Sequence, residues 1–496
     1  MNDVQLYREY KEKLNKLEYA LFIMGFDVET ICPKKDRDYS YEVQEYFENQ
    51  VMDITLSDEY FNLLSRLKDN KEGLTDIEYK SILKEHKDLQ KERRIPKELQ
   101  KEGIKIINDS RLAWMKAYDS LNYDDFEAKL EKLVDYNFKT LSYIEDKYKG
   151  FDCLLEDMEE DYTTKEYDAL FNALEHEILP LMKQILKLPK KYNKDLLNEK
   201  FDIDKQKRLT KKICALMGYT NENGYIGETL HPFTNSANVN DVRTTTKYDE
   251  SLLFSNLYSV MHEVGHALYE LNNNKELSNT YLFGGTSMGI HESQSRFYEN
   301  YLGRSKEFIE FLYPILVDEF KDQISKYSVD DIYYYVNDVS NQFYRTEADE
   351  LTYPFHVLIR YKIEKMLFNK EITVYQISDK FNELFYDYFG MMPKNKKEGC
   401  FQDVHWSSGF GYFPTYVLGN ANAAMMLEEM KKDFDPFLDM KSGNFTNVNE
   451  WLRVHVHQYG ASLSNKEVLF KACGKEFSEV PYIKYLKDKF TKIYNL

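Results

Sequence analysis

Apolar residues recur every three or four positions through most of the chain. Between residues 3 and 24 the apolar side chains at this spacing are Leu6, Tyr10, Leu14, Leu17 and Leu21. This spacing places one apolar face along a helix. It continues in the segments 53–119, 124–149, 164–187, 251–272, 291–302, 306–327, 329–346, 351–370, 374–389 and 414–432. The chain is therefore predicted to be mainly α-helical.

The pattern changes between residues 217 and 250. This segment is rich in Gly, Asn, Thr and Ser, with a few β-branched residues among them. It is the best candidate for a small β-sheet or an ordered loop region. Loops are also expected near Gly284 and across 391–413 and 433–447. No Pro/Gly/Ser-rich linker and no repeat divides the chain, so we expect one domain over residues 1–496.

Composition supports long helices and narrows the range of partners. Only 20 Gly and 11 Pro occur in 496 residues, and these are the residues that tight turns between short strands need. The formal net charge is −18. A uniformly acidic surface argues against binding to nucleic acid or to anionic membranes. We therefore expect neither as a partner.

The cysteine pattern and the N-terminal residues favour a cytoplasmic location for the protein. The chain has five cysteines, an odd number, and they lie far apart in the sequence with no CxxC motif. That pattern fits a reducing compartment better than a disulfide scaffold or a thiolate metal site. The opening residues do not resemble a signal peptide. The apolar stretch 19–26 is too short to cross a bilayer.

The strongest chemical signal is the sequence HEVGH at residues 262–266. Histidines four apart lie on one helical face, so His262 and His266 can reach one metal ion. Glu263 lies next to them, where it can act on a metal-bound water. The segment predicts a metallohydrolase; two partly buried histidines on an ordinary helix are the structural alternative.

A third protein ligand must come from elsewhere, because catalytic zinc sites use three ligands and keep one position open. Residue 272 is Asn, so the third histidine of the metzincin spacing is absent. His291 and Glu292 are the candidates downstream. A glutamate on a following helix is favoured, although spacing alone does not decide between the two.

A competing motif lies just before them. Residues 285–289 read GTSMG and fit the G-x-S-x-G nucleophile elbow of serine hydrolases. That elbow requires a preceding strand in a doubly wound sheet. The helical surroundings offer no such sheet, so Ser287 is not expected to be a nucleophile.

Further polar and aromatic clusters accompany the metal helix. In chain order the motifs are HPF at 231–233, DVRTT at 241–245, HEVGH at 262–266, HESQSR at 291–296, RTEAD at 345–349 and QDVHW at 402–406. This ordered set resembles the carboxypeptidase Taq family, metallocarboxypeptidases of the gluzincin group. The resemblance runs from about residue 231 to 424. It is loose over the first 150 residues, and Tyr344 and Met425 depart from the usual motifs.

The resemblance implies an almost wholly helical, neurolysin-like fold with a deep central groove. Residues 1–215 would form a helical lid or groove wall, and residues 216–496 would form the half that carries the metal. It also implies release of single residues from peptide C-termini with broad specificity, and a homodimer. By the same analogy Glu292 binds the metal, whereas His291 supports the site.

The residues suggest a mechanism with Zn²⁺ as the metal, although Co²⁺ or Mn²⁺ would suit the same ligands. Glu263 is the expected general base for the activated water. His405 and Tyr416 are the candidates for stabilising the oxyanion, with Tyr416 preferred by analogy.

The substrate carboxylate needs a cation, and an arginine fork pairs both of its oxygens. Arg345 is the first candidate, from the family motif. Arg243 and Arg296 are rivals, and His231 is a further candidate for contacting the substrate. Asp241 is a candidate for orienting a ligand histidine.

Two other functions are compatible with the metal helix. An oligoendopeptidase of the same clan would share the metal ligands but cut internal bonds; the RTEAD and QDVHW motifs argue against it. A catalytically inactive metal-binding or scaffold protein is the other alternative, although every residue needed for catalysis is present.

Overall fold

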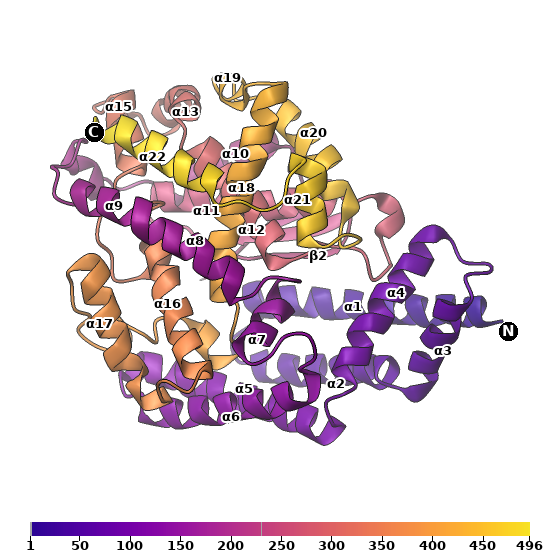
Figure 1. Ribbon diagram of the computed structural model, residues 1–496. Helices are drawn as coiled ribbons and strands as arrows, with labels where there is room; N and C mark the ends of the chain where they lie inside the picture. Colours follow the sequence, from indigo (N-terminus) through magenta and orange to yellow (C-terminus); the bar gives the residue numbers. More distant parts are fainter. Residues whose placement is uncertain (1, 230) are drawn as a thin grey trace.

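The computed structural model describes residues 2–229 and 231–496, and helices form most of it (Figure 1). The helices before the sheet are α1 (Asp3–Thr30), α2 (Arg37–Thr55), α3 (Asp58–Asp69), α4 (Asp76–Glu92), α5 (Lys97–Ser120), α6 (Asp124–Ile144), α7 (Phe151–Met158), α8 (Thr164–Glu177), α9 (Leu179–Ile185), the short 3-10 helix η1 (Lys194–Asn198) and α10 (Ile203–Met217). The mainly α prediction is confirmed.

The helices after the sheet include several short turns. They are α11 (Leu253–Leu271), η2 (Lys275–Leu277), α12 (Met288–Arg296), the π-helical turn η3 (Phe297–Gly303), α13 (Lys306–Glu319), α14 (Lys321–Ile324), α15 (Val329–Val336), η4 (Arg345–Glu347), α16 (Tyr353–Phe368), η5 (Val374–Gln376), α17 (Ile377–Phe389), η6 (Val404–Ser407), α18 (Phe413–Asp433), α19 (Pro436–Met440), α20 (Thr446–His455), η7 (His457–Tyr459), α21 (Asn465–Cys473) and α22 (Val480–Tyr494). Each helix among the described residues is too short or too polar to span a bilayer.

A small sheet occupies the segment predicted for it. Its strands are β1 (Gly224–Glu228), β2 (Thr234–Asn238) and β3 (Asp241–Thr246), in the order β1-β3-β2. β1 runs parallel to β3, whereas β2 is antiparallel to it. β2 and β3 both pack against α11. The sheet therefore lies beside the helix that carries the HEVGH sequence.

Several predicted helices are shorter or more divided than their apolar pattern suggests. The helix predicted over 329–346 ends at Val336, because the Asn337 side chain donates to the carbonyls of Arg304 and Tyr333. Such side-chain bonds compete with helix continuation. The segment 306–327 breaks at Phe320, and 291–302 divides into α12 and η3.

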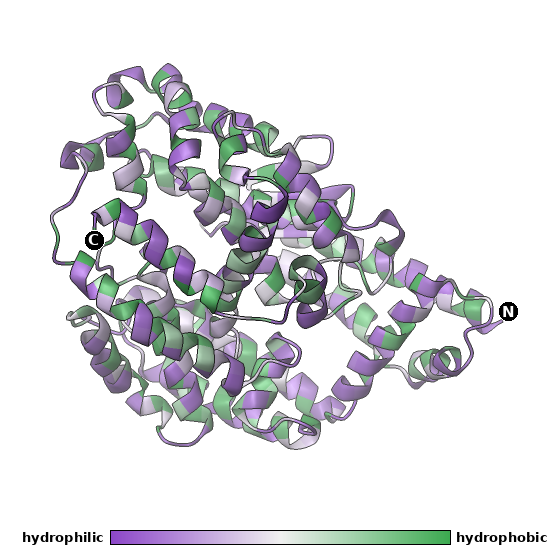
Figure 2. Ribbon diagram, turned by 45° about the horizontal axis from the view of Figure 1, so that its top comes forward, coloured by the Kyte–Doolittle hydropathy of each residue, from purple (hydrophilic) through white to green (hydrophobic). Residues whose placement is uncertain are grey.

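Two apolar cores hold the helices. The larger one includes residues from Ala113 to Tyr494, and a smaller one lies among α1, α3 and α4. Hydrophobic and hydrophilic residues alternate along the helical ribbons, as expected for amphipathic helices (Figure 2). Helices α6 to α10 thus share their core with the residues after 216.

Glycines allow α12 to lie very close to two neighbouring helices. A Cβ at Gly265 of α11 would lie 2.8 Å from the backbone oxygen of Gln294 and from Cα of Ser295. A Cβ at Gly419 of α18 would lie 2.7 Å from Cβ of Glu292. Helix α12 is therefore held between α11 and α18 at distances that leave no room for an added methyl group.

We expect Gly265→Ala to destabilise the protein by about 1–3 kcal/mol, because the added methyl group would push the α12 backbone away from α11. Gly25→Ala is the matched control. It also replaces a glycine inside a helix, but the nearest atom to its Cβ is Gln44 Oε1 at 3.9 Å. Helix propensity alone should make Gly25→Ala more stable by up to about 1 kcal/mol. Chemical denaturation measures the free energy of unfolding of both variants. Equal stability of the two variants would contradict this account of the packing.

Candidate active site

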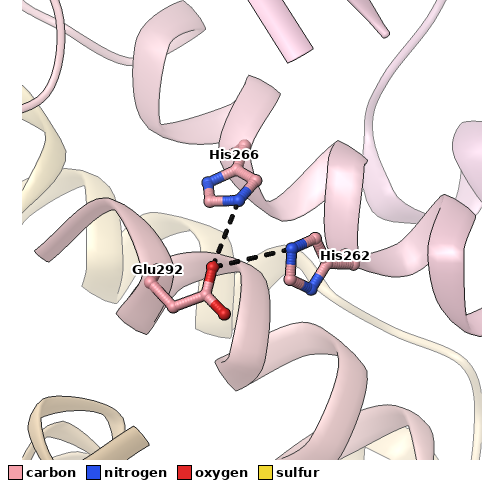
Figure 3. Close-up of side chains that lie close together, drawn as sticks. All are labelled: His262, His266 and Glu292. Atoms are coloured by element: carbon pink, nitrogen blue, oxygen red, sulfur yellow. Dashed lines mark ion pairs between the residues drawn. The ribbon is translucent and has the colours of Figure 1, made fainter. Parts of the chain in front are cut away.

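Three side chains direct potential metal ligands toward one point. His262 and His266 lie one turn apart on α11, and Glu292 comes from α12 (Figure 3). Oε2 of Glu292 is 3.6 Å from Nε2 of His262 and 3.5 Å from Nε2 of His266. Ligands about 2.0–2.2 Å from one tetrahedral ion lie roughly 3.3–3.6 Å apart. The donor set and its spacing thus fit a divalent ion.

His262 is oriented by a glutamate of the π-helical turn. Its Nδ1 lies 3.0 Å from Oε2 of Glu299, so Nδ1 carries the proton and donates to the carboxylate. The lone pair on Nε2 is thereby left for a metal. Burial disfavours the charged imidazole, but the carboxylates of Glu292 and Glu299 raise the pKa of His262 above its usual value.

His266 is oriented through a second histidine. Its Nδ1 is 2.6 Å from Nδ1 of His291, whose Nε2 is 2.6 Å from Oε1 of Glu270. A proton on His291 Nε2 bonds to the carboxylate, so His291 Nδ1 accepts from His266. Nε2 of His266 again keeps its lone pair. Burial lowers the pKa of His266 to about 3, so this imidazole is neutral.

Glu292 is held ionised by an arginine one turn further along the chain. Nε of Arg296 donates to Oε1 of Glu292 at 2.6 Å, which leaves Oε2 facing the two imidazoles. Burial alone would raise the pKa of Glu292, but the charges of Arg296 and His262 bring it well below its usual range. Between His291 and Glu292, which the spacing left open, only Glu292 faces both histidines.

Glu263 lies on the same helix and contacts β2. The hydroxyl of Thr234 is 2.7 Å from Oε2 of Glu263 and 2.9 Å from its backbone oxygen. Burial raises the pKa of Glu263 above its ordinary value. A carboxylate with a raised pKa is a stronger base than one in water.

Arg345 belongs to a buried group of charges with an excess of positive charge. Its Nε donates to Oδ1 of Asp403 at 2.9 Å, and Arg360 donates to Oδ2 of the same carboxylate at 2.6 Å. Nη1 of Arg345 donates to the hydroxyl of Tyr353 at 2.9 Å. The ring of Tyr353 in turn lies under the Arg296 guanidinium, 4.6 Å away. Tyr353 therefore lies between the candidate metal ligands and Arg345.

His405 and Tyr416 are neighbours in this group. Nε2 of His405 lies 3.1 Å from the hydroxyl of Tyr416, and the Tyr416 ring lies 4.8 Å from the Arg345 guanidinium. Burial and the charge of Arg345 lower the pKa of His405 to about 4. Burial also raises the pKa of Tyr416 well above 10. Both groups are neutral near pH 7, and Tyr416 keeps its proton.

Two other predicted substrate residues are placed differently. Arg243 donates through Nε and Nη2 to both carboxylate oxygens of Asp241, and its guanidinium lies over the rings of Phe22 and Phe26. Asp241 is thus occupied by Arg243, and the idea that it orients a ligand histidine is wrong. His231 is exposed just before β2. Ser287, the serine of the competing motif, caps the start of α12.

Sequence reasoning missed Glu270, Glu299 and Thr234. Glu270 follows His266 by four residues, a helical spacing that offers a usable signal. Glu299 carries no such signal, because it lies in the π-helical turn that follows α12. Thr234 reaches Glu263 only through the pairing of β2 beside α11.

Comparison with known proteins identifies the family of this chain. The family model described as carboxypeptidase Taq (M32) metallopeptidase matches residues 6–490. The chain belongs to this family. Carboxypeptidase 1 of Bacillus subtilis is 34% identical over 99% of both chains, and thermostable carboxypeptidase 1 of Pyrococcus furiosus is 31% identical over 98% of both.

Solved structures of carboxypeptidases share the fold of this chain. The crystal structure of an M32 carboxypeptidase from Deinococcus radiodurans covers all of both chains with a TM-score of 0.95 at 27% identity. The Pyrococcus furiosus carboxypeptidase structure covers 99% of both chains with a TM-score of 0.93. The chain is therefore a metallocarboxypeptidase, and a divalent metal ion is part of its chemistry.

We expect Glu270→Gln to weaken metal binding by about 10–100-fold, because His291 loses the charge that holds its proton and orients His266. Glu276→Gln is the control, since it makes the same chemical change at an exposed position of η2. Competition with a chelator of known affinity measures the metal affinity of both variants. Unchanged metal affinity in Glu270→Gln would show that the contacts among His266, His291 and Glu270 do not support the metal.

Proposed function

We propose that this metallocarboxypeptidase releases single residues from peptide C-termini with broad specificity. In this proposal His262, His266 and Glu292 hold Zn²⁺ and Arg345 binds the terminal carboxylate. The observation that carries the proposal is the excess positive charge around Arg345. An exopeptidase needs such a charge at a fixed position relative to its metal.

The three candidate arginines differ in how their charge is balanced. Arg243 is neutralised by Asp241, and Arg296 contacts both Glu292 and Glu299. Arg345 instead shares the carboxylate of Asp403 with Arg360. A buried charge without a partner is costly, so a substrate carboxylate beside Arg345 would remove that cost. Arg360 is fully buried, whereas Arg345 keeps 6% of its surface exposed, so Arg345 is the one of the two proposed to contact a peptide.

Glu263 is the proposed general base. A bound divalent ion supplies Lewis acidity and lowers the pKa of water. Oε2 of Glu263 accepts from Thr234, whereas Oε1 accepts no hydrogen bond among the described residues; Oε1 is therefore the oxygen proposed to take a proton and later pass it to the leaving amine. The raised pKa of Glu263 suits both transfers.

Tyr416 and His405 are proposed to stabilise the oxyanion. A neutral hydroxyl donor in a buried site stabilises developing negative charge without needing to reorganise. Tyr416 meets that requirement because its raised pKa keeps the phenol protonated. His405 is proposed to position the Tyr416 hydroxyl through their 3.1 Å contact.

The proposal also covers the metal, the compartment and the assembly. Two imidazoles and one carboxylate match the ligand preferences of zinc, although cobalt also suits them. All five cysteines are buried and unpaired, which fits a cytoplasmic enzyme. A homodimer and one catalytic domain, with residues 1–215 as a wall of the groove, follow the family resemblance. His231 and Arg243 remain proposed contacts for the outer part of the peptide.

Digestion of a ten-residue peptide tests the function. We expect a ladder of products shortened one residue at a time from the C-terminus, observed by mass spectrometry. A chelator should stop the reaction, and added Zn²⁺ should restore it. Glu263→Gln should abolish turnover while metal content stays the same, because the amide cannot accept the proton. Two internal fragments would identify an endopeptidase instead.

Arg345→Ala tests recognition of the free carboxylate. We expect the preference for a free-acid peptide over its C-terminal amide to fall by about 2–5 kcal/mol in kcat/KM, as for a buried charge pair broken on one side. Arg243→Ala is the matched comparison and should keep the preference. Melting curves of both variants establish that they fold. If Arg345→Ala still tells the two peptides apart and Arg243→Ala does not, the carboxylate binds at Arg243.

A further inference from the structure

A cavity of about 390 Å³ lies between the end of α18 and helix α22, beside the π-helical turn η3. The elements around it, including α13, α15, α19 and α22, gather in the upper part of Figure 1. The volume falls within the range of about 300–1,000 Å³ typical of small-molecule sites. No residue assigned above to the metal or the substrate lines this cavity.

The walls carry more positive than negative charge. The basic residues are Arg304, Lys306, Lys431, Lys484, Lys489 and Lys492, and the acidic ones are Glu307, Glu428 and Asp488. The whole chain has a net charge of −18, so this concentration of cations is contrary to its composition. Four of the cations form ion pairs: Lys306 with Asp330, Lys484 with Asp488, Lys489 with Glu350 and Arg304 with Glu299. The surplus therefore comes from Lys431 and Lys492, and a concave surface with a net positive charge concentrates anions.

Several of these cations have capacity to bind an anion. Lys431 and Lys492 are exposed and form no ion pair within residues 2–229 and 231–496. Of the three lining carboxylates, Glu428 pairs with Lys475, which lies outside the cavity. Nε of Arg304 is buried and makes no hydrogen bond among the described residues. A buried donor without a partner is costly, and an anion would satisfy it.

Aromatic rings complete the lining. The rings of Tyr301 and Tyr485 stack with centroids 4.2 Å apart, and Tyr333 and Phe437 line other parts of the wall. Cations beside aromatic and apolar walls suit a ligand that combines negative charge with a flat ring. A phosphate ester carries about −1.5 to −2 charges at pH 7, so one phosphate group matches the two lining lysines, Lys431 and Lys492, that form no ion pair among the described residues.

We propose that this cavity binds a small organic phosphate, a planar ring that bears one or two phosphate groups. Arg304 lines the cavity, and its Nη2 donates to Oε1 of Glu299 at 3.1 Å. The other oxygen of Glu299 lies 3.0 Å from Nδ1 of His262. A phosphate that binds Arg304 competes with Glu299 and so alters the support of His262. This coupling, unlike the binding itself, rests on the proposed role of His262 as a metal ligand.

Calorimetric titration tests the binding site, with adenosine diphosphate, pyrophosphate and adenosine as probes for ring and phosphate together, phosphate alone and ring alone. We expect saturable binding of adenosine diphosphate, weaker binding of pyrophosphate, and no binding of adenosine. The double variant Lys431→Glu/Lys492→Glu should lose at least tenfold in affinity for the diphosphate. Both lysines are exposed, so the variant should fold normally.

The matched control is Lys101→Glu/Lys194→Glu. It changes the net charge by the same amount at exposed positions outside the cavity. It should keep its affinity within twofold, and any binding of phosphate by the active-site metal is common to both variants. An equal loss in the two double variants, or no saturable binding of either phosphate probe, would overturn the proposed site.

The rate of metal loss to a chelator tests the coupling. Adenosine diphosphate should change this rate at least twofold in the unaltered enzyme and leave it unchanged in Lys431→Glu/Lys492→Glu. If the diphosphate binds at the cavity but the rate stays the same, the coupling to His262 is wrong and the binding site stands. Loss of peptidase activity would affect neither measurement.

Discussion

The close approach of α12 to α11 is the constraint on which the active site depends. The candidate metal ligands come from both helices, so one ion can join them only if the two helices lie close together. Gly265, inside the HEVGH sequence, permits that contact on one side of α12, and Gly419 of α18 permits it on the other. The glycine between the histidines therefore serves packing, whereas the histidines serve chemistry.

Burying this site requires that its charges be balanced locally. Glu292 and Glu299 face Arg296 and Arg304, so that layer contains as many carboxylates as guanidinium groups. The neighbouring group contains Arg345 and Arg360 but only Asp403. Tyr353 touches both layers. Two carboxylates thus face two guanidinium groups beside the candidate metal ligands, and the neighbouring group keeps an unbalanced positive charge, which is the arrangement that recognition of a peptide carboxylate needs.

Sequence periodicity predicted most helices, and the composition of 217–250 indicated a small sheet or an ordered loop region, because both depend on local patterns. It could not predict where α15 ends, since Asn337 stops that helix by bonding to Arg304, a residue distant in sequence. The histidines of α11 were predictable from their spacing of four. His291 and Glu292 are adjacent on α12, and only the position of α12 against α11 shows which of them faces the histidines. The pairing of Asp241 with Arg243 is likewise a result of the strand geometry.

The π-helical turn η3 explains how one segment can contact both the candidate metal site and the second cavity. In an α-helix, residues three or four apart face the same side, which suits the contacts of Arg296 with Glu292 and Glu299. Glu299 also contacts Arg304, five residues later, and the i to i+5 pattern of a π-helix brings such residues together. One oxygen of Glu299 therefore faces His262, whereas the other meets an arginine on the wall of a second cavity. A regular α-helix would place Arg304 on a different face and would separate these two environments.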